Sequence, residues 1–141
     1  MIIYADTSFF VSVYLRDGHT PAALRRLALK PRIWLTPLHE VEFAHALSQN
    51  VFRGEISRGD ADEVRENLDR DCRAALWAMT DFPAAAFTSG ADLARRYVPA
   101  LGTRTLDTLH VACALELKAE RFWTFDERQR KLARAAGLRT T

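Results

Sequence analysis

Short hydrophobic runs alternate with longer amphipathic segments along the chain. The runs at residues 2–5, 32–35 and 121–125 are rich in β-branched and aromatic residues and are too short for helices, so they predict buried strands. The segments between them carry Ser, Thr, Asp or Pro near their starts and Gly or Pro near their ends, which is typical of helices. We expect helices directly after residue 6 and at 21–29, 36–53, 57–77, 83–97, 106–117 and 126–136. A last short strand is expected at residues 138–140.

Short buried strands separated by helices predict an α/β fold. Such a fold has a mostly parallel sheet, helices on both faces and right-handed crossovers. The chain has 141 residues, the usual size of one domain, and contains no internal repeat, low-complexity tract or linker. We therefore expect a single domain over residues 1–141, with its ligand site outside the carboxyl ends of the strands.

The composition is that of an ordinary folded protein, with 48% hydrophobic and 27% charged residues. No segment approaches the roughly 20 apolar residues of a membrane span. The apolar N-terminal run contains Asp6 and lacks a basic start, unlike a signal peptide, so we expect a cytoplasmic protein. Cys72 and Cys113 match no metal-binding or redox spacing and are expected to be reduced, largely buried thiols.

The net charge of +2 is too small for a protein that holds nucleic acid by charge alone. Basic residues are clustered at 25–32 and 128–139, and acidic residues at 55–71. Clusters of this kind are most often solvated helix faces. A second role, contact with a bound phosphate, stays open for the cations nearest to the acids described next, which are Arg104, Arg128, Arg130 and Lys131.

Three aspartates stand at element boundaries. Asp6 and Asp126 follow the first and last long hydrophobic runs, and Asp107 begins the helix between them. If these strands are neighbours, the three carboxylates project into one crevice, where they stay ionised together only around a cation. Each is also a good helix cap, which typically contributes ~1 kcal/mol. Capping does not require acids here, because other residues could serve the same helix ends: Thr7, Ser8, Thr105 and Glu127.

A fourth acid is expected from the helix at 36–53, which contains both Glu40 and Glu42. Residues two apart on a helix point in nearly opposite directions, so only one of them can face the crevice. Apolar residues surround this helix almost completely, which predicts that it is buried. The pattern does not choose between the two glutamates.

Four segments together resemble one known family, the PIN domains, and within it the VapC-type toxins. IIYADTS resembles the opening strand of the family, and TPLHEVEFAHAL its second motif, in which the glutamate position is Glu42. TLDTLHVACAL resembles the helix that begins with an aspartate, and FWTFDERQRKLARAAGL the closing T-x-D segment and last helix. The motifs occur in the family's order and span residues 2–138.

The resemblance implies a three-layer α/β/α sandwich with an acidic pocket for Mg²⁺ or Mn²⁺. Its metal ligands would be Asp6, Glu42, Asp107 and Asp126, and Thr124 would accompany the last of them in the catalytic site. Ser8 is a weaker candidate. The implied activity is that of an endoribonuclease, a hydrolase in which an activated water cleaves RNA and leaves a 5′-phosphate and a 3′-hydroxyl. Carboxylate oxygens suit Mg²⁺, and the absence of softer ligands argues against zinc.

The VapC-like resemblance also implies a homodimer and an antitoxin protein that binds an apolar groove near the first helices. Aromatic residues could form that groove, although such a stripe is more often core: Phe9, Phe10, Tyr14, Trp34 and Phe43. His110 is better read as a structural histidine beside Asp107 than as a catalytic base. An RNA-processing nuclease outside a toxin–antitoxin system and a non-catalytic RNA-binding module remain alternatives. Ser8, in place of a second aspartate after Asp6, disfavours an aspartyl-nucleophile phosphohydrolase.

Overall fold

The computed structural model describes residues 1–140, which contain five strands and seven helices. The strands are β1 (Ile2–Ala5), β2 (Arg32–Leu35), β3 (Ala78–Met79), β4 (Arg121–Trp123) and β5 (Arg139–Thr140). The helices are α1 (Thr7–Tyr14), α2 (Thr20–Leu27), α3 (Pro37–Phe52), α4 (Arg58–Arg73), α5 (Ala85–Leu101), α6 (Thr105–Glu116) and α7 (Glu127–Ala135).

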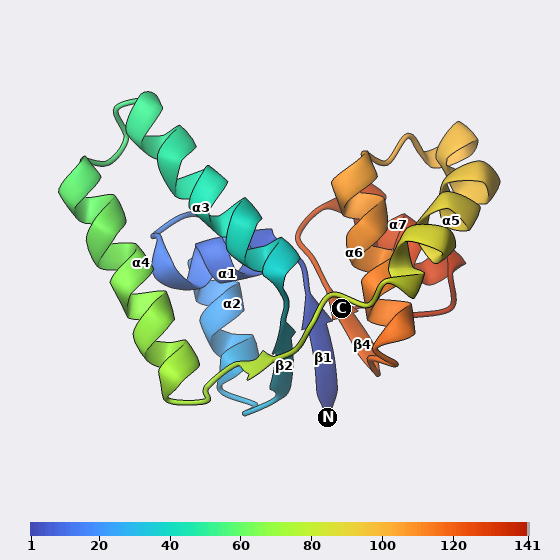
Figure 1. The fold of residues 1–141 in the computed structure, drawn as a ribbon, viewed down its shortest axis with the longest axis horizontal. Coiled ribbons are helices and arrows are strands. Elements are labelled where there is room, and N and C mark those ends of the chain that lie inside the picture. The colour runs from blue at the N-terminus through green and yellow to red at the C-terminus, as the bar shows by residue number, and fades with distance from the viewer. Residues whose placement is uncertain (141) are drawn as a thin grey trace.

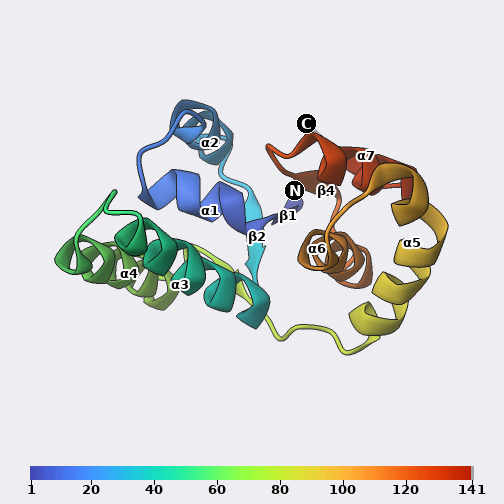
Figure 2. The ribbon, with the colours of Figure 1, turned by 90° about the horizontal axis from the view of Figure 1, so that it is seen from above.

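The strands form one sheet in the order β3-β2-β1-β4-β5, and every pair is parallel. The central strand β1 aligns Ile3 with Ile33 of β2 and Tyr4 with Phe122 of β4. Helices α1 to α4 lie on one side of the sheet and α5 to α7 on the other (Figures 1 and 2). This arrangement confirms the predicted α/β class and the three-layer α/β/α sandwich.

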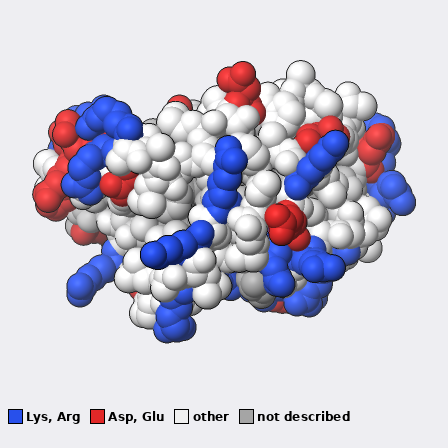
Figure 3. Space-filling view, turned by 90° about the horizontal axis from the view of Figure 1, so that it is seen from below, with Lys and Arg blue, Asp and Glu red and all other residues white. Residues whose placement is uncertain are grey.

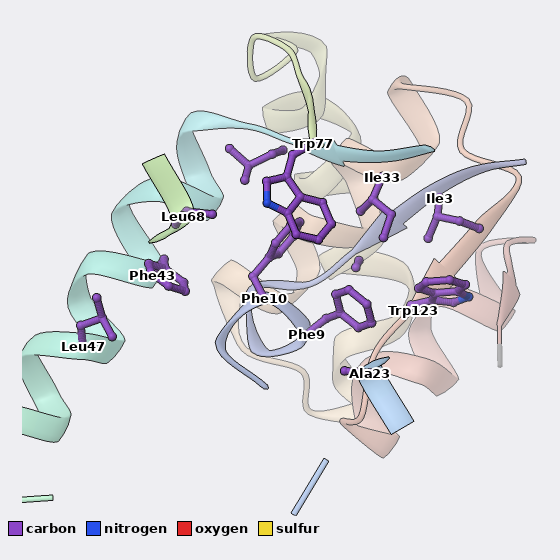
Figure 4. Packing of buried hydrophobic residues seen from close by; sticks show 12 residues of the cluster. Ile3, Phe9, Phe10, Ala23, Ile33, Phe43, Leu47, Leu68, Trp77 and Trp123 are labelled. Atoms are coloured by element: carbon purple, nitrogen blue, oxygen red, sulfur yellow. The ribbon is translucent and has the colours of Figure 1, made fainter. Parts of the chain in front are cut away.

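Each face of the sheet has its own hydrophobic core because successive strand residues point to opposite faces. In β1, Ile3 belongs to the core under α1 to α4, whereas Tyr4 belongs to the core under α5 to α7. The first core is rich in aromatic rings, with Phe10 packed edge-on against Trp77 at 5.0 Å between ring centroids (Figure 4). Full burial of such side chains contributes about 1.5–3 kcal/mol each, so both helical layers are held firmly to the sheet.

The prediction of a helix at 57–77 was wrong at its end, and strand β3 was missed. Helix α4 ends at Arg73, and Ala75 then adopts a left-handed backbone with φ of 57°. This turn brings Trp77 into the core at 3% exposure and leads directly into β3 beside β2. The usual stop signal, Gly or Asn at the left-handed position, is absent here, so no local residue pattern predicts the turn.

Three smaller expectations also changed. Strand β4 ends at Trp123, so residues 124 and 125 form a connection to α7. Helix α5 runs through Pro99 to Leu101 and stops at Gly102, where φ is 66°. Helix α3 is not buried all round, since Val41 is 62% exposed. The expected last strand is present as β5 and pairs with β4.

Both cysteines are free thiols in the described part of the chain: Cys113 is buried, as expected, and Cys72 is only partly so. Among residues 1–140, no helix is both long enough and apolar enough to cross a membrane.

Candidate active site

A cavity of about 620 Å³ opens at the carboxyl end of β1, where the predicted acids were expected to meet. It contains all four of them, Asp6, Glu42, Asp107 and Asp126, although they are spread over 120 positions of sequence. Its other lining residues are Thr7, Ser8, Val11, Val41, His45, Ala46, Arg104, Leu106 and His110. The structure therefore brings the four candidate ligands to one place.

Asp6 is the most buried of these acids, at 6% exposure. Its backbone N–H donates to the Trp123 carbonyl at 3.0 Å, which continues the pairing of β1 with β4 beyond the last strand residue. Its Oδ1 accepts from the Ser8 hydroxyl at 2.7 Å and from the Phe9 N–H at 3.3 Å, and its Oδ2 accepts from the Thr124 hydroxyl at 3.0 Å. Burial nevertheless raises the pKa of Asp6, so the ionised carboxylate gains from a nearby cation.

Glu42 is held by two side chains from opposite layers of the fold. Its Oε1 accepts from the Thr7 hydroxyl of α1 at 2.7 Å and from His110 Nε2 of α6. Burial raises the pKa of Glu42, but the hydrogen bonds from His110 and Thr7 outweigh burial and leave that pKa below its usual value. Glu40, in contrast, lines a separate depression with Met79 and Asp81. The structure thus makes the choice that the helical periodicity left open.

Asp107 and Asp126 face the cavity from the first turns of α6 and α7. Asp107 Oδ2 accepts from Arg104 Nε at 2.9 Å. Asp126 is the N-cap of α7, and its Oδ1 accepts from the Gln129 N–H at 2.7 Å. Asp6 caps α1 in the same way, but the N-cap of α6 is Arg104, so Asp107 is not a cap and Thr105 is the first helical residue. The capping alternative holds for two of the three aspartates.

Thr124 lies behind the cavity and is 1% exposed. Its hydroxyl lies 3.0 Å from Asp6 Oδ2 and 2.7 Å from Gln129 Oε1, and it accepts from the Asp126 N–H at 3.0 Å. Gln129 is fully buried and also donates to the Asp107 carbonyl at 3.2 Å. Thr124 and Gln129 therefore connect three of the acids. For Thr124 we predicted only a hydroxyl that accompanies Asp126. The role of Gln129 was not predicted.

His110 is buried and contacts Glu42 rather than Asp107. Its Nδ1 lies 2.7 Å from the Tyr4 hydroxyl. Because Glu42 Oε1 is an acceptor, Nε2 carries a proton, and in the neutral ring Nδ1 then accepts from Tyr4. Burial raises the pKa of Tyr4 well above its usual value, which keeps the phenol a donor. The expected structural histidine is therefore part of a buried chain, Tyr4 to His110 to Glu42.

Of the four cations expected near the acids, only Arg104 lines the cavity. Arg128 and Lys131 are exposed on the outer face of α7. Arg130 donates to the Thr124 carbonyl at 3.1 Å and pairs with Glu127 at 2.5 Å. Lys and Arg side chains are also spread over the end of the molecule where the N terminus lies, away from the cavity (Figure 3). Positive charge is therefore not concentrated at the cavity mouth.

For three of the five aromatic residues that we offered as a groove, the core alternative is correct. Phe9, Phe10 and Phe43 are at most 2% exposed because they form the contact between the sheet, α1 and α3. Tyr14 and Trp34 are half-buried, and the Tyr14 hydroxyl is bonded to Asp71 at 2.6 Å. Exposed apolar side chains at the cavity are aliphatic instead, namely Val41 and Leu106.

The donor set of the cavity fits a hydrated, oxygen-preferring cation. One oxygen of each of Glu42, Asp107 and Asp126 accepts no hydrogen bond from residues 1–140. No three His, Cys, Asp or Glu side chains in that range are close enough to hold a metal directly. Mg²⁺ commonly uses only one or two carboxylates and keeps several waters, so acids spaced around a cavity suit it. The four predicted ligands stay a prediction.

The sequence profile of the PIN domain matches residues 3–135. Three solved structures share the fold: VapBC2 from Rickettsia felis bound to a promoter DNA fragment (18% identity, 100% of this chain and 98% of that chain, TM-score 0.69), the sarcin-ricin loop cleaving toxin VapC20 from Mycobacterium tuberculosis (16%, 96% and 95%, 0.68), and FitAcB from Neisseria gonorrhoeae (16%, 98% and 95%, 0.70). No curated protein sequence matches the chain significantly.

Proposed function

The chain belongs to the PIN domain family, and we propose that it is an endoribonuclease dependent on Mg²⁺ or Mn²⁺ that acts as the toxin of a toxin–antitoxin pair. One observation carries the nuclease proposal: four carboxylates from four separate segments line a single cavity. Three of them have an oxygen that accepts no hydrogen bond from residues 1–140. A fold that needed these acids only as helix caps would not place Glu42 or Asp107 there.

The bound cation would lower the pKa of a water and neutralise charge on the phosphoryl oxygens of RNA. Asp6, Glu42, Asp107 and Asp126 would hold it, directly or through water. The chain itself fixes these acids before the substrate arrives. Ser8 and Thr124 hold both oxygens of Asp6. Hydrolysis of RNA at the site would leave a 5′-phosphate and a 3′-hydroxyl.

Thr7 and His110 hold one oxygen of Glu42, so this cavity-lining carboxylate is already oriented before a ligand binds. Arg104 neutralises Asp107 from the exposed side and is the cation best placed to meet an incoming phosphate. Val41 and Leu106 give the mouth an apolar rim.

The test compares two glutamates on one helix. Single-stranded RNA is incubated with the wild type, Glu42→Gln and Glu40→Gln in Mg²⁺, Mn²⁺ or EDTA. We expect cleavage by the wild type and Glu40→Gln only with metal, and a loss of about 100-fold or more in Glu42→Gln. Glu40 lines a different depression, so it controls for changes of charge on the helix. Uncut RNA with the wild type, or equal rates for the two variants, would refute the nuclease proposal.

The toxin role is supported by structural likeness to VapBC2 and to the toxin VapC20, at 18% and 16% identity. It requires a cognate antitoxin, and we expect a small DNA-binding protein encoded beside this chain. Induced expression should arrest growth, and co-expression of that neighbour should restore it. Metal-dependent cleavage without growth arrest would instead favour an RNA-processing nuclease. The expected homodimer is tested by light scattering of the purified chain.

A further inference from the structure

Arg26 on α2 is half-buried without a counterion. Its guanidinium lies over the rings of Trp123 and Phe125, at 5.5 Å and 4.9 Å from the ring centroids. It forms no hydrogen bond or ion pair with any residue in the range 1–140, and its Nη1 is a buried donor without a partner. A guanidinium has five donors in a fixed planar fork that matches carboxylate and phosphate oxygens. Arg26 therefore has donors that an anion could use.

A second guanidinium reaches the same segment from α7. Arg130 Nη2 donates to the Thr124 carbonyl at 3.1 Å, and its Nε is also a buried donor without a partner among the described residues. Arg26 therefore covers the rings of Trp123 and Phe125, and Arg130 contacts the backbone of Thr124 between them. Burial, and then the charge of Arg130, lower the pKa of Arg26, whereas Asp6 opposes this. Arg130 also pairs with Glu127 at 2.5 Å, so Arg26 is the one of these two arginines that no acid within residues 1–140 neutralises directly.

The pair of arginines contacts the segment that supports the candidate site. The Thr124 hydroxyl contacts Asp6, and Asp126 lines the cavity two residues later. A strand whose scissile phosphate enters the cavity would carry a neighbouring phosphate along this segment. Phe125 also stacks on the exposed ring of His19, with 4.3 Å between centroids and 5° between planes. Arginine and aromatic surfaces together are typical of single-stranded RNA recognition.

We propose that Arg26 and Arg130 form a subsite for a backbone phosphate of the RNA strand, next to the phosphate that is cleaved. This subsite rests on the proposed ribonuclease function, but it is tested by binding rather than by cleavage. An inorganic phosphate ion has the same charge and oxygens, so the experiment also separates the two sources.

Binding of fluorescein-labelled single-stranded RNA is measured in EDTA, from about 50 to about 200 mM KCl, for the wild type, Arg26→Met, Arg26→Lys and the control Arg25→Met. Met keeps an apolar stem over the two rings, and Arg25 is the exposed neighbour of Arg26 on the same helix. Melting temperatures confirm that each variant is folded. We expect about tenfold weaker binding for Arg26→Met and a slope of log affinity against log salt that falls by about 0.7.

Arg26→Lys should keep most of that slope with intermediate affinity, because a point charge remains without the planar fork. Arg25→Met should match the wild type. Equal slopes for Arg26→Met and Arg25→Met, or no RNA binding by the wild type at low salt, would overturn the subsite. A third result would also overturn it: inorganic phosphate raises the melting temperature of the wild type but not of Arg26→Met, while the RNA salt slopes of the two proteins are equal. The site would then bind a free phosphate ion and not RNA. Failure of the ribonuclease proposal is seen separately, as the absence of metal-dependent cleavage.

Discussion

Replacement of Tyr4 by Phe tests the buried chain that holds Glu42. Tyr4 is fully buried in the central strand, and its hydroxyl lies 2.7 Å from His110 Nδ1. The substitution deletes one oxygen and leaves the ring stacked on Phe122, with 5.8 Å between centroids. Packing is therefore almost unchanged, and the main effect is on the hydrogen bond.

The cost follows from what the substitution leaves behind. His110 is 1% exposed, so its Nδ1 would have neither water nor a protein partner in the present arrangement. A buried polar group without a partner lowers the free energy of unfolding by about 1–3 kcal/mol, and the more apolar phenyl side chain of the variant offsets only part of this loss. We expect a loss of about 1–3 kcal/mol in the free energy of unfolding. A ring that turns to find another donor would also move Nε2 away from Glu42 and weaken metal binding.

Urea denaturation followed by Trp fluorescence measures the stability, and calorimetric titration with Mn²⁺ measures the metal affinity. Tyr14→Phe is the control for metal affinity, because the Tyr14 hydroxyl contacts Asp71 and Trp77 and does not line the cavity. It should leave metal affinity unchanged. A Tyr4→Phe protein with wild-type stability and wild-type Mn²⁺ affinity would show that the Tyr4–His110 contact neither stabilises the fold nor positions Glu42.

Other substitutions test the acids and the core. Because burial raises the pKa of Asp6, its contribution to stability is present at low pH and is lost as the pH rises through that pKa. Asp6→Asn should therefore stabilise the metal-free protein at neutral pH, flatten its stability against pH in urea titrations, and abolish the rise in melting temperature that Mn²⁺ gives the wild type. Thr124→Val should cost about 1–3 kcal/mol in urea, because it removes the hydroxyl partner of buried Gln129. Trp77→Ala should cost about 3–5 kcal/mol, whereas Leu76→Ala, at a 55% exposed position, should cost less than about 1.

The sequence was most informative where one local signal coincided with one structural role. Short apolar runs became the buried strands β1, β2 and β4, and the acids that follow β1 and β4 met at one edge of the sheet because parallel strands end on the same side. Residue periodicity failed where the decision is made by tertiary contacts. Glu40 and Glu42 have equally apolar neighbours in sequence. The family motif pointed to Glu42, and in the structure the position of α6, which carries His110, places Glu42 at the cavity.

The elements that were missed have no local signature. The turn after α4 places an alanine, Ala75, at a left-handed position, and the energy that permits it comes from burying Trp77. Gln129 looks like an ordinary helical residue, and its role depends on Thr124, which reaches it across the α7 N-terminus. Phe9 and Phe10 were offered as groove residues because a hydrophobic stripe does not reveal which partner covers it.

Helix capping and metal binding are compatible uses of the same aspartate. Asp126 lines the cavity and caps α7 with Oδ1 alone, and its Oδ2 accepts no hydrogen bond from residues 1–140. Asp6 caps α1 with Oδ1 as well, and its Oδ2 accepts a neutral hydroxyl. Both carboxylates therefore occupy helix ends that would otherwise attract a phosphate. If the chain binds RNA as proposed, a phosphate would meet negative charge at the positions where bare helix ends would have bound it. Its approach would then depend on a cation held by these acids. We therefore expect RNA binding in the cavity to be coupled to metal binding.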